Sequence, residues 1–234
     1  MTESTANPAS AATKESAVKS RIFIVDDHAM FREGLRQLIE REPDLAVCGD
    51  AASADEALPA IARLKPGLVI IDLSLSGTSG IDLIKAIREQ HEDIPVLVVS
   101  MHEETLYAER ALRAGAMGYV MKAEPGKTVK AAIRKVLAGN MHLSEAMATT
   151  VFSKYVRGAQ AAPPPSPIES LSDRELEVFR LLGEGKGIRQ IAEEFQLSVP
   201  TINTFRNRIK EKLRLKSSTE VMLHAMQWVQ HSSS

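Results

Sequence analysis

Five side chains that suit phosphate chemistry lie where short apolar segments of the sequence end. Asp26 and Asp27 follow the first segment and Asp72 closes the third. Ser100 closes the fourth segment, and Lys122 follows the fifth. Carboxylates held close together repel one another, which favours a hard cation between them, and an all-oxygen site with bound water suits Mg²⁺. A carboxylate beside Mg²⁺ and an ammonium group can accept a phosphoryl group, so the pattern indicates Asp72 as the nucleophile.

The apolar segments that carry these side chains are short, β-branched and continuous. They cover residues 21–25, 45–49, 68–72, 96–100 and 118–121, and amphipathic helical segments alternate with them. This pattern predicts a doubly wound α/β domain with a five-stranded parallel sheet, because continuous apolar runs suit strands buried on both faces. The carboxyl ends of parallel strands share one edge, so the five side chains should converge there. Any one of the acids could equally be a helix cap, but capping gives no reason for the placement of the serine and the lysine.

Composition and charge exclude several classes of protein. The chain has 234 residues, of which 44% are hydrophobic and 25% charged, which is typical of a globular protein. The formal net charge of −1 excludes a uniformly basic nucleic-acid coat but allows a local basic patch. Cys48 is the single cysteine, so no intrachain disulfide or cysteine-based zinc site is expected. No apolar run approaches the ~20 residues of a membrane span, so we expect a cytoplasmic protein with no membrane partner.

The sequence divides into four parts. Residues 1–20 are rich in serine, threonine and alanine and predict a disordered tail, and residues 21–142 hold the α/β domain. Residues 143–167 form a linker that is proline-rich at its end and compatible with one helix at its start. Residues 168–234 show no strand pattern and predict a small all-α domain of four helices, two of which begin with an S-x-x-E capping box.

The first domain resembles the receiver domain of bacterial two-component response regulators, which have a flavodoxin-like fold. The resemblance covers residues 21–139 and is carried by the acids at 26, 27 and 72, the serine at 100, the tyrosine at 119 and the lysine at 122. It implies that a sensor histidine kinase phosphorylates Asp72. It also implies that Asp26, Asp27, Asp72 and the Ser74 carbonyl hold Mg²⁺. The loop after the acceptor reads L-S-G at 75–77, without the usual proline, but this departure removes no chemical group.

The same resemblance implies a switch. Lys122 would contact the phosphoryl group, Ser100 would move to hydrogen-bond it, and Tyr119 would swing inward behind the serine. A phosphoryl group adds about two negative charges, which can bias such a two-state element. The alternative for Tyr119 is a strand aromatic that packs in the core.

The helical domain contains a basic amphipathic segment. Ile202, Phe205, Ile209 and Leu213 form one apolar stripe, while residues 201–216 carry a local charge of +5. A basic helix after a short helix and a tight turn is typical of a helix-turn-helix that binds double-stranded DNA. The bland alternative is a solvated charged face. Asparagine suits the edge of adenine, and basic residues suit phosphates. The candidate DNA contacts are Asn203, Thr204, Arg206, Asn207, Arg208, Lys210 and Arg214.

Residues 171–217 closely resemble the LuxR-type helix-turn-helix of the NarL/FixJ class of response regulators. The matching runs include L-S-x-R-E-x-E-V and I-K-E-K-L. Asn203 and Phe205 depart from the lysine and histidine of many members, which should shift the preference towards adenine contacts. The resemblance makes the last helix, with Met222, Met226 and Trp228, a candidate homodimer surface on DNA; packing in the domain's own core is an equal alternative.

The two resemblances together predict a DNA-binding transcriptional regulator that is not an enzyme and is switched by phosphorylation of Asp72. Two alternatives remain open at this stage. The first is a transcription factor that works without phosphorylation. The second is a phosphohydrolase with an aspartate nucleophile, although that chemistry usually wants a second acid two residues on, where this chain has Ser74.

Overall fold

A computed structural model describes residues 19–75, 77–157 and 167–232 of the chain, with the side chains of 154–157 and 232 left out. The predicted tail therefore lies outside the described residues, apart from its last two. The first domain contains five strands in the order β2-β1-β3-β4-β5, and every pair of neighbours is parallel. The strands are β1 Ser20–Val25, β2 Leu45–Ala51, β3 Leu68–Ile71, β4 Val96–Ser100 and β5 Gly118–Met121. The predicted doubly wound parallel sheet is confirmed.

Three strand boundaries differ from the prediction, and the second strand runs on to Ala51, two residues past the predicted end. The first strand begins at Ser20, because its backbone N–H donates to the Asp44 carbonyl at 2.9 Å and joins the first strand to the second. The third strand ends at Ile71. Asp72 therefore stands just beyond the sheet edge rather than within the strand.

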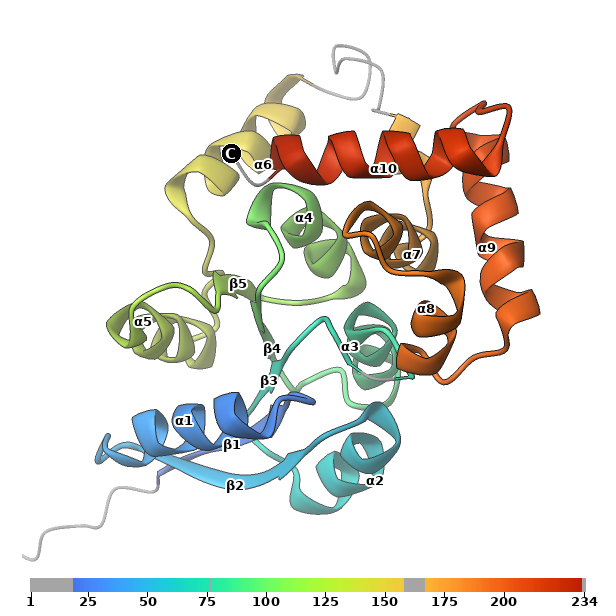
Figure 1. The fold of residues 1–234 in the computed structure, drawn as a ribbon. Coiled ribbons are helices and arrows are strands. Elements are labelled where there is room, and N and C mark those ends of the chain that lie inside the picture. Colours follow the sequence, from blue (N-terminus) through green and yellow to red (C-terminus); the bar gives the residue numbers. More distant parts are fainter. Residues whose placement is uncertain (1–18, 76, 158–166, 233–234) are drawn as a thin grey trace, which may run out of the picture.

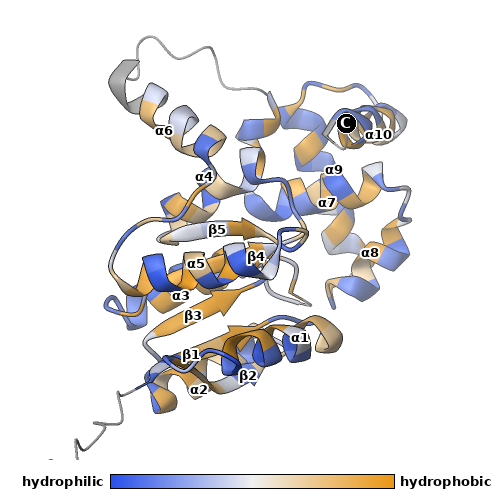
Figure 2. Cartoon of the chain, turned by 90° about the vertical axis from the view of Figure 1, so that its left-hand side faces the viewer, coloured by the Kyte–Doolittle hydropathy of each residue, from blue (hydrophilic) through white to orange (hydrophobic). Residues whose placement is uncertain are grey.

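Helices cover both faces of the sheet (Figure 1). They are α1 Ala29–Glu40, α2 Ala54–Leu64, α3 Gly80–Gln90, α4 Glu104–Ala114 and α5 Gly126–Leu137. On one face, α1 and α5 pack against side chains such as Ile22 and Ile24. On the other face, α2, α3 and α4 pack against alternate side chains such as Phe23 and Val25. Figure 2 shows β3 in the hydrophobic colour, in keeping with the burial of all four of its residues.

The rest of the described chain is helical. It contains α6 Glu145–Arg157, a 3₁₀ turn at Pro167–Ser170, α7 Asp173–Gly183, α8 Ile188–Glu194, α9 Val199–Lys212 and α10 Ser218–Ser232. The predicted capping box begins α7: the Ser172 side chain accepts from the Glu175 N–H, and the Glu175 carboxylate accepts from the Ser172 N–H at 2.7 Å. These bonds satisfy backbone donors that a helix start would otherwise leave unpaired.

Gly80 brings the start of α3 close to the carboxyl edge of the sheet, where Asp72 lies. A Cβ atom there would meet the carbonyl oxygen of Asp72 and lie 2.6 Å from Cα of Leu73, both of which are backbone atoms that cannot move aside alone. Only glycine therefore allows α3 to begin this close to Asp72.

We predict that Gly80→Ala lowers the free energy of unfolding by about 1–3 kcal/mol, the usual cost of forcing extra atoms into a packed site. Chemical denaturation measures the change. Gly34→Ala is the matched control, because Gly34 lies on the exposed side of α1 with no atom within 4 Å of an added Cβ. In that control the free energy of unfolding should rise by about 0.5–1 kcal/mol, because alanine has the higher helix propensity. An equal rise in the free energy of unfolding in both variants would contradict the close contact between Gly80 and the backbone of Asp72 and Leu73.

Candidate functional site

The carboxyl edge of the sheet brings the predicted side chains together. Asp26 directly follows β1, Asp72 directly follows β3 and Lys122 directly follows β5. The Lys122 Nζ atom lies 2.6 Å from Oδ2 of Asp26 and 2.7 Å from Oδ2 of Asp72. The sheet has therefore placed one ammonium group between two carboxylates that are 46 residues apart in the sequence.

This cluster is almost completely withdrawn from water. Asp26 and Asp72 are each 2% exposed, and the Lys122 side chain is 4% exposed. Burial raises the pKa of Asp72, and the neighbouring Lys122 charge opposes that rise. The stem of the lysine passes the ring of Phe31, whose centroid lies 4.3 Å from Nζ. The ammonium thus has an aromatic wall on one side and the two acids on the other.

Asp27 and His28 complete the acidic cluster. Asp26, Asp27, His28 and Asp72 each offer one ligand atom, and these atoms all lie within 4.8 Å of one another. The Nδ1 atom of His28 is 2.7 Å from Oδ1 of Asp27. The three carboxylates supply the oxygen ligands that hard divalent cations prefer. The sequence analysis assigned no role to His28, although its place directly after two acids was a signal.

A short-range network surrounds the acids. The Ser74 N–H donates to Oδ1 of Asp72 at 3.3 Å, which holds the loop after the strand against the carboxylate. Ser100 is fully buried, and its Oγ atom accepts from the His102 N–H at 3.3 Å. The Tyr119 hydroxyl donates to the His102 carbonyl at 2.8 Å. Tyr119 is 1% exposed, so its side chain is buried here, and its movement on phosphorylation stays a prediction.

His102 was missed by the sequence analysis. Its Nε2 atom lies 2.8 Å from Oγ of Ser74, and its ring stacks on Tyr107 with centroids 4.4 Å apart. Burial lowers the pKa of His102 to about 3, so the ring is neutral. A lone histidine in a loop has no spacing pattern, so the sequence carried no signal for this contact.

The predicted DNA-reading helix is α9. Ile202 and Ile209 are fully buried, and Phe205 and Leu213 pack partly buried beside the core, so the predicted apolar stripe is confirmed. The helix lies at the edge of the molecule, away from the sheet (Figure 1). Thr204, Asn207, Arg208 and Arg214 are exposed, while Asn203, Arg206 and Lys210 are half-buried.

The candidate dimer residues on α10 differ in their surroundings. Met222 is 40% exposed, and Met226 is half-buried. The Trp228 ring lies 5.6 Å from the ring of Phe179 in α7 and lines a cavity. Trp228 thus packs within this chain, and Met222 has the most accessible side chain of the three.

The helical domain docks on α3 and α4 of the first domain. The Arg110 guanidinium donates to the Leu171 carbonyl at 2.8 Å and to Oδ1 of Asp173 at 3.1 Å. The Nζ atom of Lys85 lies 3.1 Å from Oδ2 of Asp173. Asp173, the first residue of α7, therefore connects to both helices of the first domain.

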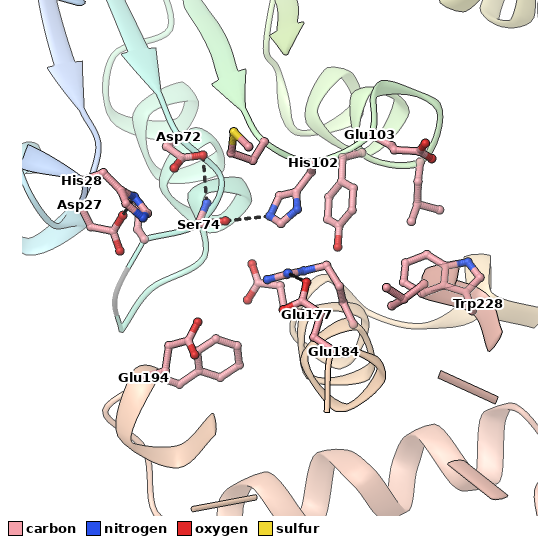
Figure 3. A pocket seen from close by; sticks show the side chains of 17 residues that line it. Asp27, His28, Asp72, Ser74, His102, Glu103, Glu177, Glu184, Glu194 and Trp228 are labelled. Carbon is pink, nitrogen blue, oxygen red and sulfur yellow. Dashed lines mark hydrogen bonds and ion pairs between the residues drawn. The ribbon is translucent and has the colours of Figure 1, made fainter. Parts of the chain in front are cut away.

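A cavity of about 440 Å³ lies between the two domains (Figure 3). Arg174 donates to the Gly77 carbonyl, so the helical domain also contacts the loop that follows Asp72. Burial raises the pKa of Glu177, and the nearby Arg174 opposes that rise. The cavity is lined from one side by Asp27, Asp72, Ser74, His102 and Tyr107, and from the other by Glu177, Arg180, Glu184, Glu194, Phe195 and Trp228.

An acidic pocket at the carboxyl edge of a five-stranded parallel sheet, joined to a helix-turn-helix, defines a DNA-binding response regulator. Two family models match the chain: "Response regulator receiver domain" over residues 22–134 and "Bacterial regulatory proteins, luxR family" over residues 169–225. The chain belongs to the two-component response regulators with a LuxR-type DNA-binding domain, the NarL/FixJ class. None of the helices that the structure describes combines the length and apolar character needed to cross a bilayer.

Related proteins cover nearly the whole chain. The oxygen regulatory protein NreC of Staphylococcus carnosus is 33% identical over 209 residues, which is 88% of this chain and 96% of that protein. The response regulator GacA of Pseudomonas protegens is 32% identical over 206 residues, with 88% and 95% covered.

Solved structures agree with the architecture. A two-component response regulator of the LuxR family from Aurantimonas sp. SI85-9A1 is 38% identical, with a TM-score of 0.55 over 59% of this chain and 99% of that one. The RcsB response regulator of Salmonella typhimurium shares the fold, with a TM-score of 0.65, 21% identity, and 90% and 98% covered.

We predict that Lys122→Met lowers the free energy of unfolding of the first domain by about 3–5 kcal/mol, because it leaves buried carboxylates without their counter-charge. Adding Asp72→Asn to that variant should recover part of the loss. Chemical denaturation measures both, and Lys135→Met, at an exposed position on α5, is the control with an expected change within about 0.5 kcal/mol. A small effect equal to that of the control would show that the ammonium does not neutralise the buried acids.

Proposed function

We propose that this chain is a transcriptional regulator that a sensor histidine kinase switches by phosphorylating Asp72. The observation that carries the proposal is the buried Asp72 carboxylate held 2.7 Å from the Lys122 ammonium, within one acidic cluster. In the transfer, an Asp72 carboxylate oxygen bonds to phosphorus while the bond from phosphorus to the kinase histidine breaks. Lys122 then turns its charge to the new phosphoryl oxygens.

The acidic cluster is suited to Mg²⁺. Its ligands would be carboxylate oxygens of Asp26, Asp27 and Asp72 and the backbone carbonyl of Ser74. When bound, the ion neutralises charge on the transferred phosphoryl oxygens. Ser100 would then donate to a phosphoryl oxygen, and Tyr119 would hold the loop behind it.

In this proposal, two copies of the chain together bind double-stranded DNA. Asn203 and Asn207 suit adenine edges, and Thr204 suits a thymine methyl group. The arginines and lysines of α9 suit phosphates and set the register of the helix on DNA. Met222 is the most accessible of the three candidate dimer residues on α10, and doubling the contacts raises affinity through effective concentration.

The proposed division of labour follows the domains. Residues 21–142 receive the phosphoryl group, residues 143–167 link the domains, and residues 168–234 bind DNA. A regulator that reads the chromosome of a bacterium works in the cytoplasm, which we propose as its location. We also propose that the phosphoryl transfer serves as a switch and not as turnover of a small substrate, so the chain is not an enzyme.

We predict that a small phosphodonor with Mg²⁺ labels the wild type and raises its DNA affinity about 5- to 150-fold, the usual range of 1–3 kcal/mol for coupled sites. Asp72→Asn should abolish both labelling and the rise in affinity, because the amide has no nucleophilic oxygen anion. Intact-mass spectrometry and a DNA-binding titration measure the two effects.

The controls separate the alternatives. Asp55→Asn, at an exposed acid on α2, should behave as the wild type, and chelation of Mg²⁺ should prevent labelling. Labelling of Asp72→Asn would identify a different acceptor. Unchanged DNA affinity of the fully labelled wild type would favour a factor that works without phosphorylation, and steady release of many phosphates per chain would favour a phosphohydrolase.

We predict that Asn207→Ala relaxes the preference at one base pair by about 1–3 kcal/mol, because it removes an amide that can pair with one adenine. Binding to a set of operators with single base changes measures the preference. Arg208→Ala is the contrasting variant: it should weaken binding to all sequences and reduce the salt dependence by one phosphate contact. A uniform loss for Asn207→Ala as well would make Asn207 a backbone contact.

A further inference from the structure

His102 is a meeting point of three parts of the first domain. Its ring lies 2.8 Å from the hydroxyl of Ser74, in the loop that follows Asp72. Its backbone N–H donates to the hydroxyl of Ser100 at the end of β4, and its carbonyl accepts from the hydroxyl of Tyr119 in β5. One buried residue therefore contacts the hydroxyls of Ser74, Ser100 and Tyr119.

The opposite side of His102 leads towards the helical domain. The imidazole stacks on the Tyr107 ring, with centroids 4.4 Å apart and planes 17° from parallel. Tyr107 belongs to α4 and is 3% exposed. Both rings line the cavity between the domains, and Glu177 of α7 and Glu184, which directly follows α7, face His102 across it (Figure 3). A movement of the imidazole would therefore change the surface on which α7 docks.

A phosphoryl group on Asp72 would compete for the hydroxyl contacts that hold His102. The Ser74 N–H already donates to the Asp72 carboxylate, so its hydroxyl lies within the same short loop as the acceptor. We take the tautomer in which Nε2 of His102 accepts and the Ser74 hydroxyl donates. That hydroxyl has one proton to donate, and a hydrogen bond to an anionic oxygen is about twice as strong as a neutral one. Ser74 would thus leave the imidazole, and movement of Ser100 would break its contact with the His102 N–H.

We propose that His102 is the positioning residue that couples phosphorylation to the docking of the DNA-binding domain. While Ser74 holds the imidazole, the ring supports Tyr107 as part of the docking surface for α7. When Ser74 turns to the phosphoryl group, the imidazole loses its partner and moves into the cavity, which releases α7. This inference rests on the proposed function of Asp72.

The experiment compares the wild type with Ser74→Ala, with His102→Phe, with the double variant and with His102→Gln. Phenylalanine keeps a flat ring against Tyr107 but cannot hydrogen-bond, while glutamine supplies a side-chain amide that can. Trp228 is the single tryptophan of the chain and lines the cavity, so its fluorescence reports docking. Fluorescence and DNA affinity are measured for the full chain before and after complete labelling by the phosphodonor. Thr105→Ala removes an exposed hydroxyl of α4 and is the matched control.

Without phosphodonor, Ser74→Ala and His102→Phe should each shift the Trp228 emission towards that of the labelled wild type and raise DNA affinity about threefold or more. The double variant should go no further than either single one, because both remove the same hydrogen bond. His102→Gln should remain close to the wild type, as should Thr105→Ala. This rescue separates a hydrogen-bonding role from a merely structural one.

Two results would overturn the coupling, and they differ in what they say of Asp72. If the unlabelled variants match the wild type while phosphodonor still shifts all of them, the relay through His102 is wrong and the function of Asp72 stands. If the unlabelled variants show the shifted Trp228 emission and higher DNA affinity, but complete labelling changes neither in the wild type, phosphorylation of Asp72 does not release the helical domain. The proposed function then fails together with the coupling.

Discussion

The structure depends on one buried electrostatic arrangement, in which the Lys122 ammonium lies between the carboxylates of Asp26 and Asp72. Charges withdrawn from water are stable only with partners close by, so the three strands that carry these residues must keep their register. The parallel sheet provides that rigidity because it is buried on both faces. The phosphoryl group proposed for Asp72 would add about two negative charges to this arrangement, and we expect the neighbouring loops to move in response.

Most of the fold and of the acidic cluster could be predicted from the sequence, because local patterns determine them. Continuous β-branched runs indicated the strands, and the acids at their ends then converged at the shared edge. The contact between Ser74 and His102 and the bridge from Arg110 to Asp173 could not be predicted. Both join residues that are distant in the sequence, and a single polar residue in a loop or on a helix surface carries no periodic signal for its partner.

The docked arrangement covers one functional surface and leaves the other free. The cavity between the domains is lined by Asp72 and by α7 and α8 residues such as Glu177 and Glu194. On α9, Thr204, Asn207 and Arg208 are exposed to solvent. In this arrangement the helical domain therefore covers the acidic cluster around Asp72, while four of the seven residues proposed to read DNA are exposed and three are half-buried.

The outward position of the α9 polar face has a consequence for how such regulators diversify. Thr204 and Asn207 touch neither the sheet nor the docking contacts, whereas Ile202 and Ile209 on the same helix are fully buried. With the DNA contacts proposed for this face, mutations there would change the set of genes that is recognised while the first domain is inherited intact. One ancestral chain can in this way give rise to many regulons through a few surface substitutions after gene duplication.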